Sequence, residues 1–213
     1  MSAVETARTD GGESVSSAPS WAPPDRPLRA DARRNRDAVL VAAAEAFAER
    51  GVEAPLEDIA KAAGVGVGTL YRHFPTREAL VFGVYSREVE QLAASAPELV
   101  AELEPGEALR EWMRRFVHYA ATKRGLIGML RTMMADDTDL FDRTKMQIRS
   151  AASGLLARAA EAGQIRADVD AEDLVRSMGG ICMASGRDGA SDCAGRLVDL
   201  VFDGLRYGAP ADR

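Results

Sequence analysis

The sequence predicts an all-α protein of about nine helices, in which a three-helix unit near the N-terminus precedes a larger helical domain. Apolar residues recur every three to four positions through most of the chain after residue 33, and no stretch shows the alternation typical of a strand. Glycine or proline separates successive apolar stripes and marks the expected helix ends. We therefore divide the chain into residues 1–30, 31–83 and 84–213.

The composition excludes several classes of protein. The chain carries a net charge of −6 and only two cysteines, too few for a disulfide framework or a cysteine-based zinc site. No apolar run approaches the roughly 20 residues that a membrane-spanning helix needs, and the first 30 residues lack the hydrophobic core of a secretion signal. We expect a cytoplasmic protein with no membrane segment, no metal ion and no cofactor.

The first 30 residues hold four of the nine prolines and are rich in Ser, Ala, Gly and charged residues, so we expect a disordered arm. A helix is expected over residues 33–50, with Leu40, Ala43 and Phe47 facing the next two helices and Gly51 as its end.

Residues 56–74, LEDIAKAAGVGVGTLYRHF, predict two short helices joined by a tight turn. An apolar stripe at helical spacing is formed by Leu56, Ile59, Ala60 and Ala63. Gly64 can leave that helix with φ > 0, and Leu70 and Phe74 form the inner face of the second helix. A helix-turn-helix of this kind presents its second helix to the DNA major groove.

These residues resemble the DNA-binding region of the tetracycline-repressor (TetR) family. GVGVGTLYRHFPTREAL is similar to the family pattern G-V-S-x-G-T-L-Y-x-H-F-x-x-K-E-x-L, and the resemblance covers residues 33–85. Gly66 stands where a serine usually caps the second helix, and Pro55 where threonine is common. Glycine is an acceptable N-cap and proline suits a first helical turn, so the expected fold is unchanged.

The resemblance implies a homodimer that binds double-stranded DNA and a small-molecule effector. The DNA-binding candidates are Arg33, Arg34, Val67, Gly68, Thr69, Tyr71, Arg72, His73 and Arg77. Thr69, Tyr71, His73 and Arg77 are the candidates for phosphate contacts, because hydroxyl, imidazole and guanidinium groups all donate hydrogen bonds to phosphate oxygens. Arg72 and Val67 are the candidates for recognising the base sequence, because arginine binds guanine O6 and N7. The alternative for such side chains is a packing or solvated role on the helix surface.

The remaining chain keeps a helical pattern. Pro75 and Thr76 introduce a fourth helix, whose long apolar stripe links the three-helix unit to the rest. Further helices are expected over residues 105–125, 126–134, 138–162, 170–185 and 191–207. Gly125 is expected to break the first of these, Gly163 to end the third and Asp170 to cap the fourth.

The last two helices are the expected dimer surface, because the resembled family pairs them into a four-helix bundle. The interface candidates are Leu197, Val198, Val201, Phe202 and Leu205. Two recognition helices related by a symmetry axis read a palindrome, which one short helix cannot do.

Seven of the eight methionines lie after residue 110. Methionine fills irregular cores, so ordinary packing accounts for any single one. As a group in an effector domain, they predict an adaptable hydrophobic pocket formed by Trp112, Met113, Phe116, Tyr119, Met129, Met133, Phe141 and Met178. Its candidate polar groups are Arg114, His118, Arg131 and Gln147.

The sequence thus predicts a ligand-responsive transcriptional regulator, in the first instance a repressor that binds a palindromic operator and is released by a small hydrophobic or amphipathic effector. Activation instead of repression stays open. The alternative from another class is a helical binding or scaffold protein whose helix-turn-helix has lost DNA binding. An enzyme is not expected, because the two histidines form no Ser-His-Asp set or metal cluster in the sequence.

Overall fold

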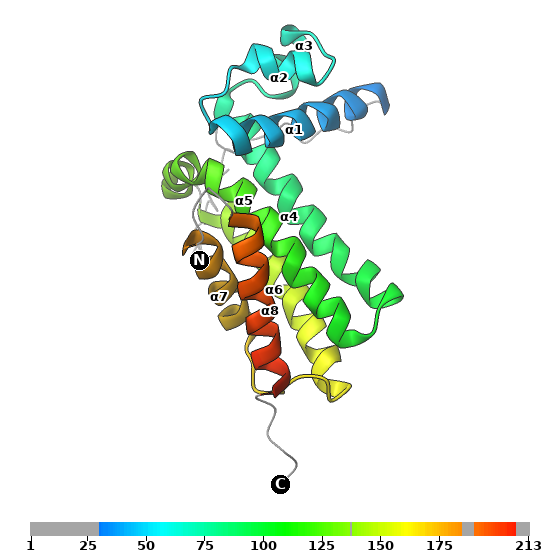
Figure 1. The fold of residues 1–213 in the computed structure, drawn as a ribbon. Helices are drawn as coiled ribbons and strands as arrows, with labels where there is room; N and C mark the ends of the chain where they lie inside the picture. Colours follow the sequence, from blue (N-terminus) through cyan, green and yellow to red (C-terminus); the bar gives the residue numbers. More distant parts are fainter. Residues whose placement is uncertain (1–29, 137, 185–189, 208–213) are drawn as a thin grey trace, which may run out of the picture.

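The computed structural model describes residues 30–136, 138–184 and 190–207, which form eight helices and no strand (Figure 1). The helices are α1 Ala30–Arg50, α2 Leu56–Ala62, α3 Val67–His73, α4 Arg77–Glu102, α5 Pro105–Asp136, α6 Thr138–Glu161, α7 Ala171–Ala184 and α8 Ala190–Tyr207. This confirms the all-α prediction. Apart from Ala30, the predicted N-terminal arm lies outside the described residues.

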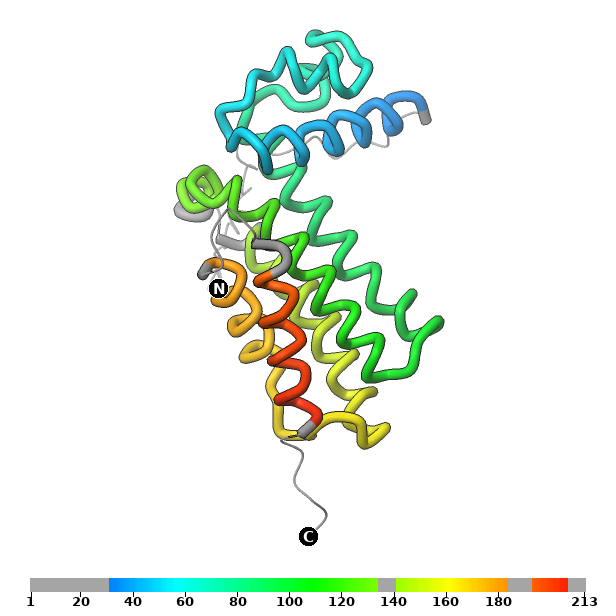
Figure 2. Tube along the Cα trace, viewed as in Figure 1, coloured from blue at the N-terminus to red at the C-terminus, as the bar shows by residue number. Residues whose placement is uncertain are grey.

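The helices form an elongated molecule with α1, α2 and α3 at one end (Figure 1). From this end α4 runs along the bundle beside α5 and α6, whereas α7 and α8 pack on α5, as the chain trace in Figure 2 also shows. The boundary predicted at residue 83 falls inside α4, so the three-helix unit and the rest of the bundle share this helix. No described helix combines the length and apolar composition needed to cross a membrane.

The three-helix unit has a core of fully buried side chains from α1, α2, α3 and the following residue, and these are Leu40, Phe47, Ile59, Leu70 and Phe74. Thr76 caps α4 by accepting a hydrogen bond from the Ala79 amide at 3.2 Å. Gly83 lies where α4 meets this core, since a Cβ there would stand 2.8 Å from Phe74 Cε1 and 3.0 Å from Leu40 Cδ2.

The predicted break at Gly125 is wrong, and α5 continues through it to Asp136. This glycine instead lets α5 approach α1, because a Cβ at Gly125 would lie only 2.6 Å from the backbone oxygen of Phe47. Two expected helices therefore merge into one, which accounts for eight helices instead of nine.

The contact at Gly125 gives a stability prediction. Gly125→Ala forces a methyl group against the Phe47 carbonyl, and we expect it to lower the free energy of unfolding by about 1–3 kcal/mol, as overpacking does. Gly128→Ala is the matched control on the same helix, because nothing lies within 4 Å of its Cβ position. The control should gain up to about 1 kcal/mol from helix propensity. Urea denaturation of both variants measures the difference, and equal shifts would contradict the close approach.

Candidate functional site

The turn between α2 and α3 closes in a Schellman motif. Gly64 has φ +68, and its amide bonds to the Lys61 carbonyl at 3.1 Å while the Val65 amide bonds to the Ala60 carbonyl at 3.0 Å. Gly66 then serves as the N-cap of α3 without a side-chain cap, and its carbonyl accepts from the Thr69 amide at 2.8 Å. Backbone hydrogen bonds therefore define the turn between the two helices.

One face of α3 is anchored and the other is open. Leu70 and Phe74 are fully buried, whereas Tyr71 is 43% exposed and Arg72 is exposed, with its Nε donating to the Gly68 carbonyl at 3.4 Å. Of the other predicted DNA-binding residues in this segment, Thr69 and His73 are half-buried, Val67 packs partly against the core and Gly68 is exposed. The helix therefore offers a polar outer surface at the end of the molecule (Figure 1).

Positive charge gathers beside this surface. Arg36 of α1 lies over the Phe74 ring, 5.4 Å from its centroid, and it contributes to the environment of His73 together with Arg72. Burial, followed by these two guanidinium groups, lowers the pKa of His73, so the imidazole is mostly neutral at neutral pH. Arg33 and Arg34 are exposed at the start of α1, where Arg34 forms an ion pair with Asp31.

Arg77 is held in a different way from the other candidates. Its Nη1 donates to the carbonyl oxygens of Val52 and Ala54, the latter at 2.7 Å, and the side chain is partly buried. The guanidinium thereby ties the first turn of α4 to the loop between α1 and α2. The sequence pattern assigned Arg77 to phosphate binding, whereas the structure gives its side chain an internal bonding role.

A cavity of about 580 Å³ lies among α5, α6 and α7. This volume is in the range of small-molecule sites. Its lining consists of Phe116, Tyr119, Ala120, Lys123, Arg124, Ile127, Arg131, Asp142, Lys145, Ile148, Arg149, Glu172, Val175, Arg176, Gly179, Cys182 and Met183.

Two of the eight predicted pocket residues, Phe116 and Tyr119, line this cavity. The other six do not, and these are Trp112, Met113, Met129, Met133, Phe141 and Met178. All of them except the partly buried Met129 are buried in the hydrophobic core, so they fill space between helices instead of facing an opening. Of the predicted polar groups only Arg131 lines the cavity, while Arg114 pairs with Asp199 at 3.0 Å.

Most polar side chains of the cavity were missed by the sequence analysis. Lys123 lies on the α5 stripe with Phe116, Ala120 and Ile127, all of which line the cavity. A cation at an apolar position of a helical stripe is the signal that could have identified it. The cations of α6 and α7 carry no such signal, because only the packing of distant segments brings them to α5.

The predicted dimer residues divide into two groups. Val198, Phe202 and Leu205 are buried within the protomer, where they hold α8 on the bundle, so they offer no surface to a second copy in this structure. This corrects the expectation for these three. Leu197 and Val201 are half-buried, and the large apolar side chains that are exposed on α7 and α8 are Met183 and Leu200, at 54% and 67%.

A helix-turn-helix at the end of a helical bundle that contains a cavity defines a DNA-binding transcriptional regulator with a second helical domain. Residues 39–84 match the family model of bacterial regulatory proteins of the tetR family. Residues 104–207 match the model of the C-terminal domain of SbtR-like transcriptional regulators.

Solved structures that match this chain over almost their whole length agree with these models. A TetR transcriptional regulator from Streptomyces coelicolor is 47% identical, with a TM-score of 0.75 over 83% of this chain and 99% of that chain. A TetR transcription regulatory protein from Mycobacterium vanbaalenii is 38% identical, with a TM-score of 0.67 over 84% of this chain and 99% of that chain. The chain belongs to the TetR family of transcriptional regulators, which are transcription factors and not enzymes.

A curated relative matches only in part. An HTH-type transcriptional regulator of Staphylococcus aureus is 36% identical over 80 residues, which are 36% of this chain and 41% of that protein. The chain therefore matches less than half the length of that relative.

The contrast between Arg77 and Arg72 gives a second prediction. Arg77→Met removes two hydrogen bonds from a charged donor, and we expect it to lower the free energy of unfolding by about 1–3 kcal/mol. Arg72→Met, on the open face, should change stability by no more than about 0.5 kcal/mol but weaken DNA binding about tenfold. Urea denaturation and DNA titration measure the two effects. An unfolding midpoint unchanged by Arg77→Met would return this residue to the DNA-contact candidates.

Proposed function

We propose that the protein is a homodimeric repressor that binds a palindromic operator through α3 and is released by a small hydrophobic or amphipathic effector in the cavity among α5, α6 and α7. The observation that carries the DNA-binding part is the open face of α3, where Tyr71 and Arg72 are exposed beside the positive charge of Arg36. In this proposal Arg72 reads a base edge, while Thr69 and Tyr71 donate to phosphate.

A dimer can read a longer DNA site than a single α3 can. The seven residues of α3 reach only a few base pairs, so a second copy related by two-fold symmetry doubles the site and makes it a palindrome. Support for an interface on α7 and α8 comes from the exposed Met183 of α7 and Leu200 of α8, together with the half-buried Leu197 and Val201 of α8. These side chains gain from burial against a partner.

In this proposal, the helices that connect the cavity to α3 allow the effector to release the protein from its operator. The cavity uses residues of α5, and α5 contacts α1 at Gly125, while α4 joins α3 to the bundle. In this proposal an occupied cavity favours an arrangement in which the two copies of α3 no longer match successive major grooves, about 34 Å apart. Operator and effector then weaken each other's binding by the same factor.

Operator binding is tested by fluorescence anisotropy with a duplex from the DNA upstream of the protein's own gene and a scrambled duplex of equal composition. We expect tight binding to the first, weak binding to the second and a steep fall in affinity with salt, because phosphate contacts release counterions. Tyr71→Phe and Arg72→Ala should weaken the specific complex.

If neither duplex binds, selection from random duplexes identifies the operator of a distant gene. Failure of that selection to enrich any sequence would refute the proposal.

The α7–α8 interface predicts that Leu200→Glu separates the dimer. A charge on this exposed apolar position opposes its burial, and we expect the dimer dissociation constant to rise about 30-fold or more. Analytical ultracentrifugation measures the constant, and the palindromic operator should lose affinity in parallel. Met146→Glu is the control, because Met146 is similarly exposed, at 65%, but lies on α6 and not on α7 or α8. If Leu200→Glu changes the dimer dissociation constant no more than the control does, the interface lies elsewhere.

A further inference from the structure

The cavity among α5, α6 and α7 is strongly basic although the chain is acidic. Its lining contains six cationic side chains, Lys123, Arg124, Arg131, Lys145, Arg149 and Arg176, against the two carboxylates of Asp142 and Glu172. The excess of four positive charges stands in a protein whose net charge is −6. Like charges repel one another across a cavity, so this concentration is costly unless a negative partner arrives.

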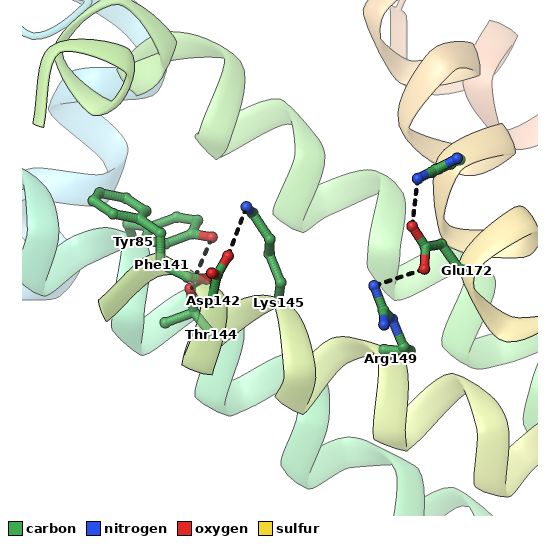
Figure 3. A network of polar contacts seen from close by, with 8 residues as sticks. Tyr85, Phe141, Asp142, Thr144, Lys145, Arg149 and Glu172 are labelled. Carbon is green, nitrogen blue, oxygen red and sulfur yellow. Dashed lines mark hydrogen bonds and ion pairs between the residues drawn. The ribbon is translucent and has the colours of Figure 1, made fainter. Parts of the chain in front are cut away.

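The two carboxylates are already engaged. Asp142 pairs with Lys145 at 3.0 Å, and the two oxygens of Glu172 pair with Arg149 at 2.8 Å and Arg176 at 2.5 Å. Figure 3 shows Lys145 bonded to Asp142 on the same helix, and Arg149 reaching from α6 to Glu172 of α7. Both negative charges of the lining are thus already paired with cations.

Lys123, on α5, is one of the lining cations that take no part in these pairs. Its Nζ lies 5.8 Å from the ring centroids of both Tyr85 and Tyr119, so aromatic faces provide its partial compensation. Burial, followed by the ammonium of Lys145, lowers the pKa of Lys123. The surroundings therefore disfavour the charged form, and the aromatic contacts do not offset this in full.

Most of the remaining lining is apolar. Phe116, Ala120 and Ile127 of α5 face Ile148 of α6 and Val175 of α7 across the cavity. A ligand that fills this space therefore needs both an apolar body and a negative group.

We propose that the effector is an amphipathic organic anion, whose carboxylate or phosphate binds Lys123 and Lys145 and whose apolar part lies between α5, α6 and α7. The inference rests on the proposed function and gives its effector a chemical class. A neutral lipophile leaves the ammonium of Lys123 without an anionic partner, and a cation adds to the repulsion, so both bind more weakly than the anion.

The test uses two fluorescent probes of nearly equal shape, anilinonaphthalenesulfonate and phenylnaphthylamine, which lacks the sulfonate. Titration of the full chain should give a dissociation constant at least about tenfold lower for the anionic probe. Displacement of this probe by decanoate, decyl phosphate or decanol identifies the acid group, because only the matching anion competes strongly and the alcohol does not.

Three variants assign the preference to the cavity. Lys123→Met should abolish the difference between the probes, Lys123→Arg should retain it, and Lys145→Met, at an exposed position, should reduce it without affecting folding. Arg143→Met is the matched control, because it removes one positive charge from an exposed position of α6 outside the cavity lining. Circular dichroism checks that each variant is folded.

Equal affinities for the two probes, no binding of either probe, or equal effects of Lys145→Met and Arg143→Met would each overturn the proposal. DNA titrations without any probe separate this outcome from failure of the proposed function. A chain that binds its operator but shows no anion preference loses only the effector class. A chain that prefers the anion through Lys123 but binds no DNA sequence loses only the repressor function.

Discussion

The backbone contact between α5 and α1 fixes how the recognition helix is held. A Cβ at Gly125 would stand 2.6 Å from the Phe47 oxygen, so the two helices meet where no other side chain fits. A second close contact, between Gly83 of α4 and Phe74 at the end of α3, holds the other side of the three-helix unit. Because these contacts leave almost no free space, we expect a shift of α4 or α5 to reach α3 instead of being absorbed by loose packing.

Local charge, and not the net charge of −6, determines what this protein attracts. Charges further apart than about 10 Å are largely screened, so an acidic chain can carry basic surfaces if its acids lie elsewhere. One such surface surrounds Arg36 and Arg72 near α3, and the other lines the cavity with Lys123 and its neighbours. In the proposed function one surface meets DNA and the other an anionic effector, and α5 connects the cavity to α1 at Gly125.

The helix-turn-helix could be predicted because its signals are local. Gly64 sits at the positive φ that the turn requires, and Leu70 and Phe74 occupy the buried face that their spacing indicated. Long-range packing decides the rest. A glycine that breaks a helix and one that admits a neighbouring backbone look alike in sequence, so Gly125 was misread. Likewise, helical periodicity identifies an apolar face but not its partner, and Phe202, assigned to a second protomer, packs within its own.

In the proposed mechanism, Lys123 connects the cavity to the helices that hold the three-helix unit. It lies two residues before Gly125 on α5, and its ammonium contacts the ring of Tyr85 on α4, whose hydroxyl bonds to Thr144 of α6 at 3.1 Å (Figure 3). An anion in the cavity competes with the aromatic faces for this ammonium, because a full negative charge attracts it more strongly than a ring does. Movement of Lys123 toward that anion changes a contact with α4 and a segment of α5 that touches α1. In the proposed mechanism, the charge of the effector, and not only its bulk, then separates the two arrangements of α3.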